Sequence, residues 1–278
     1  MKILSLLAAS AAAITLATPA FAQTERDASQ DFDGPYVGVT GGYTVQPNDG
    51  RETLVFDTNR DGTFGDTVNT SGGVDAFLPG FCGGSPTGTA NLNCRNDKDG
   101  FEYFGKLGYD KRMGNFVVGA VLEGGRSEAS DSVTGFSSTP ATYRFNRSAD
   151  YQANARLRAG YTPGGGVLFY ATGGGAYAKL DNRFSTTNSV NSFADNGRTN
   201  GWGYVAGGGA EAMLTRNISL GLEYLYTDIQ DDDFVVNVGP GTAPPTNPFL
   251  LNGGGTDMKR GDDKFRTHSV RASLNFRF

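Results

Sequence analysis

The sequence predicts an all-β protein, an eight-stranded antiparallel up-and-down transmembrane β-barrel with long loops at one end and short turns at the other. Segments of about 10 residues alternate between apolar and polar side chains, as strands that face lipid on one side and a lumen on the other must do. The connections between these segments are alternately long and short, and the last segment ends the chain on an aromatic residue. These three observations together favour a membrane barrel over a soluble sheet.

The composition argues against other classes. Glycine accounts for 41 of the 278 residues and aromatic residues for 12%, whereas disordered chains lack aromatics. Beyond the first 22 residues, the longest strongly apolar run is 116–122, which is too short for a spanning helix. A chain that enters a membrane without such helices must do so as a closed barrel, because every backbone group in hydrocarbon has to be paired.

The first 22 residues have a short basic start, an apolar run and an Ala-Phe-Ala triplet, which predict a secretory signal peptide cut after Ala22. The mature chain would then comprise a short periplasmic N-terminal segment, 23–34, and a barrel domain, 35–278. Loss of Lys2 leaves 23 basic against 29 acidic residues and a net charge near −6. This balance argues against nucleic acid as a partner.

The first four expected strands each have two unlike faces. Strand 35–45 has an apolar face formed by Val37, Val39 and Tyr43. Strand 101–111 sets aromatic residues and Leu107 against a polar face of Glu102, Lys106 and Asp110. Strand 116–127 places Val118, Ala120 and Leu122 opposite Glu123, and strand 151–161 alternates small or apolar residues with Gln152, Asn154, Arg156 and Arg158. Such alternation indicates strands with one lipid-facing side.

The last four strands complete an even number. Strand 167–180 is rich in aromatics and glycine, and its two faces cannot be assigned from the sequence. Strand 201–214 carries Trp202 and Tyr204 opposite Glu211, and strand 218–229 carries Leu220, Leu222 and two tyrosines opposite Glu223. Strand 264–278 separates Val270 and Leu274 from Arg271 and Arg277. The long polar connections 46–99, 129–149, 181–199 and 230–263 are expected to be loops, although 54–56 and 74–78 could form extra strands.

Two segments resemble a known family. The segment G-W-G-Y-V-A-G-G-G-A-E-A-M-L-T-R-N-I-S-L-G-L-E-Y-L-Y-T-D at 201–228 joins a Gly-rich strand ending in Glu to a strand with Glu-Tyr-x-Tyr, and 264–278 ends in an aromatic signature. Both resemble the small eight-stranded outer-membrane barrels of the opacity-protein and OmpA-transmembrane-domain type, a porin-like family of Gram-negative bacteria.

The resemblance covers all eight strands in pattern and implies a location in the outer membrane, in contact with its lipid. It also implies a structural or surface role in the envelope, with the long loops presented outside. Phe276 and Phe278 would form the signature that the barrel assembly machinery reads. The first long loop, which contains a cysteine pair, departs from the shortest family members, so functions carried by loops cannot be transferred.

Five charged residues are predicted to meet inside the barrel at similar depth, because each lies roughly six to eight residues from the turn end of its strand. They are Lys106, Glu123, Arg156, Glu223 and Arg271. An eight-stranded barrel has room only for side chains, and buried charges must be paired. The sequence therefore predicts an ion-pair network that acts either as a structural plug or as a narrow gated pore.

The loops contain two further candidate features. Cys82 and Cys94 are the only cysteines, and in an exported protein they are expected to form a disulfide. Asp57, Asn59 and Asp61 occupy calcium-loop positions, but Val68 stands where a bidentate Glu is needed, so a polar hairpin turn is the alternative. The glycine runs 173–175 and 207–209 lack a following Gly-Lys-Ser/Thr, and no cofactor is expected.

An enzymatic function is not expected. Some small barrels that act on lipid use a His-Ser pair on the outer surface, and His268 is the only histidine. Alternation places His268 and Ser269 on opposite faces, where they cannot cooperate in nucleophilic catalysis. The sequence thus favours a structural or surface barrel, with a low-conductance pore or a loop-based adhesin or ligand-binding surface as alternatives. Neither a specific ligand nor an oligomeric state can be inferred.

Overall fold

A computed structural model describes residues 31–47, 52–89 and 92–278. The predicted signal peptide, its cleavage site after Ala22 and residues 23–30 lie outside these ranges. Within them, no helix is long and apolar enough to cross a membrane.

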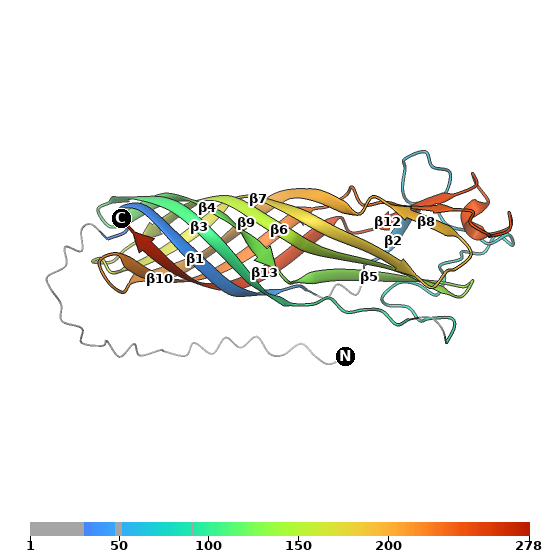
Figure 1. The fold of residues 1–278 in the computed structure, drawn as a ribbon, viewed down its shortest axis with the longest axis horizontal. Coiled ribbons are helices and arrows are strands. Elements are labelled where there is room, and N and C mark those ends of the chain that lie inside the picture. The colour runs from blue at the N-terminus through green and yellow to red at the C-terminus, as the bar shows by residue number, and fades with distance from the viewer. Residues whose placement is uncertain (1–30, 48–51, 90–91) are drawn as a thin grey trace.

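Eight antiparallel strands form a closed barrel, which confirms the predicted fold (Figure 1). The order around the barrel is β1, β13, β10, β9, β7, β6, β4 and β3, and pairing of β4 with β6 and of β3 with β1 closes the ring. The barrel strands are β1 (Gly34–Val45), β3 (Gly100–Met113), β4 (Phe116–Ser127), β6 (Ala141–Tyr161), β7 (Val167–Thr186), β9 (Arg198–Met213), β10 (Ile218–Gln230) and β13 (Lys264–Arg277).

The outer wall of the barrel is apolar and carries two zones of aromatic rings. Near the short turns, hereafter the turn end, these include Tyr109, Phe116, Tyr161, Phe169 and Phe276. Toward the long connections, the loop end, they include Tyr43, Phe101, Tyr151, Trp202 and Tyr204. Aromatic girdles of this kind mark the two interfaces of a membrane.

The long connections are more ordered than the sequence predicts. Residues 129–149, expected to be a loop, form β5 (Ser130–Ser137) and an extension of β6, paired from Ser130↔Ser148 to Ser137↔Ala141. β7 likewise continues to Thr186. The expectation of a loop was wrong because these strand segments lie outside the membrane. Their side chains therefore do not alternate between lipid and lumen, which is the pattern used to recognise strands in the sequence.

A second sheet covers the loop end, built from β2 (Leu54–Asp57), β12 (Thr256–Arg260), β11 (Val236–Gly239) and β8 (Ser192–Asp195). The predicted extra strand at 54–56 falls within β2, whereas 74–78 contains only a bridge between Asn69 and Asp75. A short 3-10 helix, η2 (Pro248–Leu250), lies in the same region. We call the described residues of the long connections (52–99, 128–148, 181–197 and 231–263) the cap.

Candidate functional site: the filled lumen and the cap

All five charged residues predicted for the lumen point inward, and each is at most 8% exposed. Arg156 pairs with Glu123 at 2.8 Å and with Glu223 at 2.9 Å, and Arg271 reaches Glu123 at 3.1 Å. Lys106 lies opposite Glu123 in the β3–β4 register. The structure therefore brings these side chains together at one depth, which we call the middle layer.

The sequence analysis missed one member of the middle layer, Glu102. Its carboxylate accepts a 2.5 Å contact from Nε of Arg271 and a 2.6 Å hydrogen bond from the hydroxyl of Thr44. With Glu102 included, the layer holds three carboxylates and three cations. Glu102 shares the polar face of β3 with Lys106, so alternation already placed it inside the barrel, but it lies farther from the turn end than the depth estimate allowed.

A second charged group, the turn-end layer, lies closer to the short turns and was also missed. Arg158 pairs with both carboxylate oxygens of Asp110 and with Glu211 at 2.8 Å. Arg277 joins the same two acids at 2.8 and 2.7 Å. The ring of Tyr36 lies beneath both guanidinium groups, 5.0 Å from Arg158 and 4.6 Å from Arg277. Two acids and two cations again balance.

Phe32, two residues before the start of β1, closes the mouth of the barrel at the turn end. Phe32 is 1% exposed and packs with Val117, Leu168 and Tyr170. Its backbone has φ +60°, a left-handed conformation that costs a non-glycine residue free energy and persists only where contacts compensate. Gly166 in the β6–β7 turn donates a 2.9 Å hydrogen bond to the carboxylate of Asp31. The chain thus crosses the mouth and inserts a phenyl ring into it.

Above the middle layer, the lumen is filled by apolar side chains. Leu180, Leu225, Ile229 and Phe265 are each at most 1% exposed, and they pack with Val205 and inward alanines. Since water cannot be accommodated among such side chains without losing their contacts, this apolar layer separates the middle layer from the loop end.

A third group of charges, the loop-end layer, lies where the barrel meets the cap. Arg260 of β12 contacts Glu52 at 2.8 Å and Asp131 of β5 at 2.5 Å. Arg147 of β6 contacts Asp131 at 2.6 Å and Asp231 at 3.7 Å. The first, second and fourth long connections are therefore joined by buried ion pairs, and here three acids face two cations.

The cap has a hydrophobic core of its own. Its buried members come from the first, second and fourth long connections, and they include Phe56, Phe77, Tyr143, Val236, Phe249 and Met258. The third connection contributes the partly buried Phe184 and Phe193, which pack against this core. The ring of Phe77 lies 4.5 Å from that of Phe56, 5.3 Å from Tyr143 and 6.1 Å from Phe249. A core shared among all four connections makes the cap one folded unit.

The segment with calcium-loop spacing forms a turn that is closed by its own hydrogen bonds. The carboxylate of Asp57 accepts from the backbone N–H groups of Asp61 and Gly62, at 3.2 and 2.7 Å, and Asn59 donates to Asp61 at 3.0 Å. The turn projects Arg60, which donates to the carbonyl of Val238 and pairs with Asp257. Among the described residues, no group of three or more His, Cys, Asp or Glu side chains could hold a metal ion.

The other residues singled out in the sequence are also located. The predicted disulfide between Cys82 and Cys94 is present, with an S–S distance of 2.00 Å. His268 lies on the outer wall, 2.6 Å from the hydroxyl of Tyr224, whereas Ser269 faces the lumen and bonds to Glu102 at 3.2 Å. The two side chains therefore lie on opposite sides of the barrel wall. Phe276 and Phe278 also face outward, with ring centroids 5.1 Å apart.

The loop-end layer lies beyond the aromatic girdle and outside the membrane-spanning segments, and it predicts a pH dependence. Burial, reinforced by the charge of Asp131 and Asp97 and opposed by Arg260 and Arg147, raises the pKa of Glu52 to about 7. Burial also acts on Asp131, but the charges of Arg260 and Arg147 prevail and lower its pKa. Asp131 therefore changes charge only below the range in which Glu52 titrates.

We expect the cap to open more readily at pH 7 than at pH 5. Between the ordinary glutamate pKa, 4.5, and about 7, the closed cap retains a proton on Glu52 that the open cap releases, so its stability falls as pH rises. The pKa of Glu52 is about 7 in the closed cap, against its ordinary value of 4.5, so opening is expected to be roughly 40-fold more frequent at pH 7 than at pH 5. Hydrogen exchange of the backbone amides of β2 and β12, corrected for intrinsic exchange rates, measures how often the cap opens. Glu52→Gln should remove the slope, and an unchanged slope in that variant would contradict the assignment.

Comparison with known proteins gives consistent matches. A family model described as outer membrane protein beta-barrel domain matches residues 6–278. The 31 kDa outer-membrane immunogenic protein of Brucella melitensis biotype 1 is 26% identical over 254 residues, covering 89% of this chain and 84% of the relative. The 22 kDa outer membrane protein of Rhizobium leguminosarum bv. viciae is 31% identical over 175 residues, covering 62% of this chain and 72% of the relative.

A solved structure matches the fold. The outer membrane protein OprG of Pseudomonas aeruginosa superimposes with a TM-score of 0.50 at 12% identity, covering 89% of this chain and 98% of OprG. At this identity, the likeness concerns the barrel architecture alone.

Proposed function

Because this chain belongs to the family of outer membrane protein beta-barrel domains and lies in the cell outer membrane, we propose that it is a non-conducting barrel that presents its folded cap at the cell surface. The short turns then face the periplasm and the cap faces outward. In this role the barrel anchors and orients the cap, and the cap is the functional surface.

The observation that carries the proposal is the filling of the lumen from end to end. Phe32 lies in the periplasmic mouth, and two charge-balanced layers, an apolar layer and the loop-end layer follow it toward the cap. Buried charges that are fully paired stabilise a fixed arrangement, whereas a pore needs charged groups that water can reach. This arrangement favours a plug over a channel.

The cap supports the second half of the proposal. Rigid barrels with long external connections commonly carry their specific functions on those connections. The Brucella relative is described as immunogenic, and we infer that the cap is the corresponding antigenic surface of this protein. Its role as an adhesin or ligand-binding surface is a narrower form of the same proposal.

Planar-bilayer recording tests the plug. We expect the refolded mature protein, from Gln23 onward, to show no discrete openings, because the buried side chains of the apolar layer lie across the lumen. Discrete conductance in the wild type that changes in Arg271→Ala would instead assign the middle layer to a narrow gated pore and would overturn the proposal. Heat-dependent mobility on a gel should confirm that both proteins are folded before recording.

A further inference from the structure

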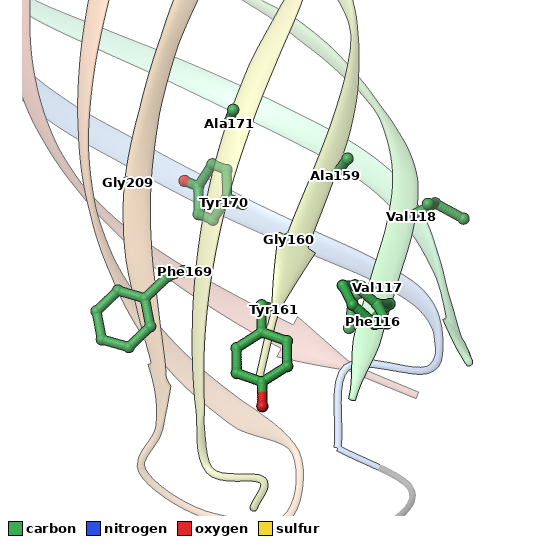
Figure 2. A pocket seen from close by; sticks show the side chains of 10 residues that line it. All are labelled: Phe116, Val117, Val118, Ala159, Gly160, Tyr161, Phe169, Tyr170, Ala171 and Gly209. Atoms are coloured by element: carbon green, nitrogen blue, oxygen red, sulfur yellow. The ribbon is translucent and has the colours of Figure 1, made fainter. Parts of the chain in front are cut away.

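A groove of about 560 Å³ lies at the periplasmic ends of β4, β6, β7 and β9. Figure 2 shows the aromatic side chains of Phe116, Tyr161 and Phe169 nearest the short turns, and the smaller side chains of Val118, Ala159 and Ala171 farther along the wall. Phe116, Tyr161 and Phe169 are 62%, 44% and 55% exposed, so the groove opens toward the lipid-facing side.

The groove exists because one sector of the outer wall is built from small residues. Ala159 of β6 pairs with Ala171 of β7, which pairs with Gly208 of β9. In the next outward row, the exposed Leu157 of β6 pairs with Gly173, which pairs with Ala206, so this leucine ends the recess on β6. The strands on either side carry larger outward side chains, Val118 and Leu122 on β4 and Leu222 and Tyr224 on β10. A recess bounded by two ridges is the result.

The depth of the groove determines what can fill it. It begins at the periplasmic girdle and extends toward the middle of the barrel wall, so its surroundings are the acyl chains of the periplasmic leaflet. Its volume lies within the roughly 300–1,000 Å³ typical of sites for small ligands. A second copy of the chain fits poorly, because two recessed faces placed together would enclose a void instead of close-packed side chains.

A cation lies at the periplasmic rim beside this sector. Arg216 is in the turn between β9 and β10, is exposed, and makes no hydrogen bond or ion pair with another described residue. The other rim cations are engaged: Lys111 pairs with Asp33 at 3.0 Å, and Arg112 donates to the carbonyl of Gly114. A guanidinium at the level of the headgroups that has no partner among the described residues suits a phosphate group.

We propose that this groove is a binding site for an anionic phospholipid of the periplasmic leaflet. One acyl chain lies against Ala159, Ala171 and Gly208, between the ridges of β4 and β10, and the phosphate-bearing headgroup pairs with Arg216. The aromatic rings of Tyr161 and Phe169 flank the chain where it enters the groove.

Native mass spectrometry of the full mature protein, refolded in detergent and titrated with 1-palmitoyl-2-oleoyl phosphatidylglycerol or phosphatidylcholine, tests the site. We expect one phosphatidylglycerol molecule to be retained more tightly than phosphatidylcholine. Ala171→Leu projects a larger side chain into the floor of the groove, displaces part of the acyl chain and should weaken this binding about tenfold, the equivalent of roughly two methylene contacts. Arg216→Gln should abolish the preference for phosphatidylglycerol. Ala272→Leu, on the outer wall of β13, is the matched control and should bind as the wild type does.

Three outcomes would overturn the proposal: equal retention of both lipids by the wild type, equal binding by Ala171→Leu and Ala272→Leu, or a dimer in place of the lipid adduct. Heat-dependent gel mobility checks that each variant is folded, and Ala159→Leu replaces Ala171→Leu if the latter does not refold. Cross-linking with a phosphatidylglycerol that carries a diazirine on its acyl chain should label peptides of β6 and β7. Labelling spread evenly over all strands would show ordinary surrounding lipid and would also overturn the site.

Discussion

Replacing Arg158 with methionine is expected to destabilise the barrel by about 3–5 kcal/mol. Arg158 is 4% exposed and pairs with both Asp110 and Glu211. Without it, two buried carboxylates share the single cation Arg277, and one negative charge is left uncompensated where water cannot reach. Methionine fills much of the volume of the arginine side chain, so the loss of stability comes mainly from the missing charge and only in small part from a cavity.

Urea unfolding in phosphatidylcholine vesicles measures this loss. Trp202 is the only tryptophan of the chain and lies on the lipid-facing wall, so its fluorescence follows the transfer of β9 from lipid to water. Adding Glu211→Gln to Arg158→Met restores charge balance and should recover a large part of the stability. Arg183→Met, which breaks an exposed pair with Asp181, is the surface control and should be nearly neutral. A variant Arg158→Met as stable as the wild type would show that the turn-end layer does not hold the barrel together.

The barrel could be predicted from the sequence because the membrane imposes a simple rule on each strand. Lipid lies on one side and a narrow lumen on the other, so alternation alone assigns inward and outward faces, as it does for Arg156 and Leu157. The depth of each inward residue could not be predicted in the same way. Strands in a barrel are tilted and staggered, so counting from the turns identified Glu123 and Arg271 but missed Glu102 and Arg158.

The cap could not be predicted because its contacts join segments far apart in the sequence. β2 and β12 pair through Phe56↔Met258, about 200 residues apart. Strands of four or five residues carry too little alternation to be recognised alone. The segment at 57–62 shows the same limit, because its spacing fits a cation loop. The carboxylate of Asp57 instead accepts hydrogen bonds from backbone N–H groups of the turn, and the exposed Arg60 donates to a carbonyl of β11.

Replacing Phe77 with alanine is expected to open the cap and leave the barrel folded. Phe77 lies on the first long connection, is 5% exposed, and its ring contacts those of Phe56, Tyr143 and Phe249. Removing a buried phenyl ring costs about 3–5 kcal/mol. The strands of the cap sheet are too short to compensate, whereas the barrel ladder below does not depend on this ring.

Trypsin digestion of the protein in vesicles separates the two effects. Phe77→Ala should expose cap sites such as Arg95 and Lys259 to cleavage, while the barrel keeps its heat-dependent gel mobility. Leu78→Ala, at the neighbouring position but 68% exposed, is the control and should resist trypsin as the wild type does. If Phe77→Ala also abolished the heat-dependent mobility, cap and barrel would fold as one cooperative unit. The cap could not then change without affecting the barrel, and the proposal that the barrel anchors a separately folded cap would be wrong.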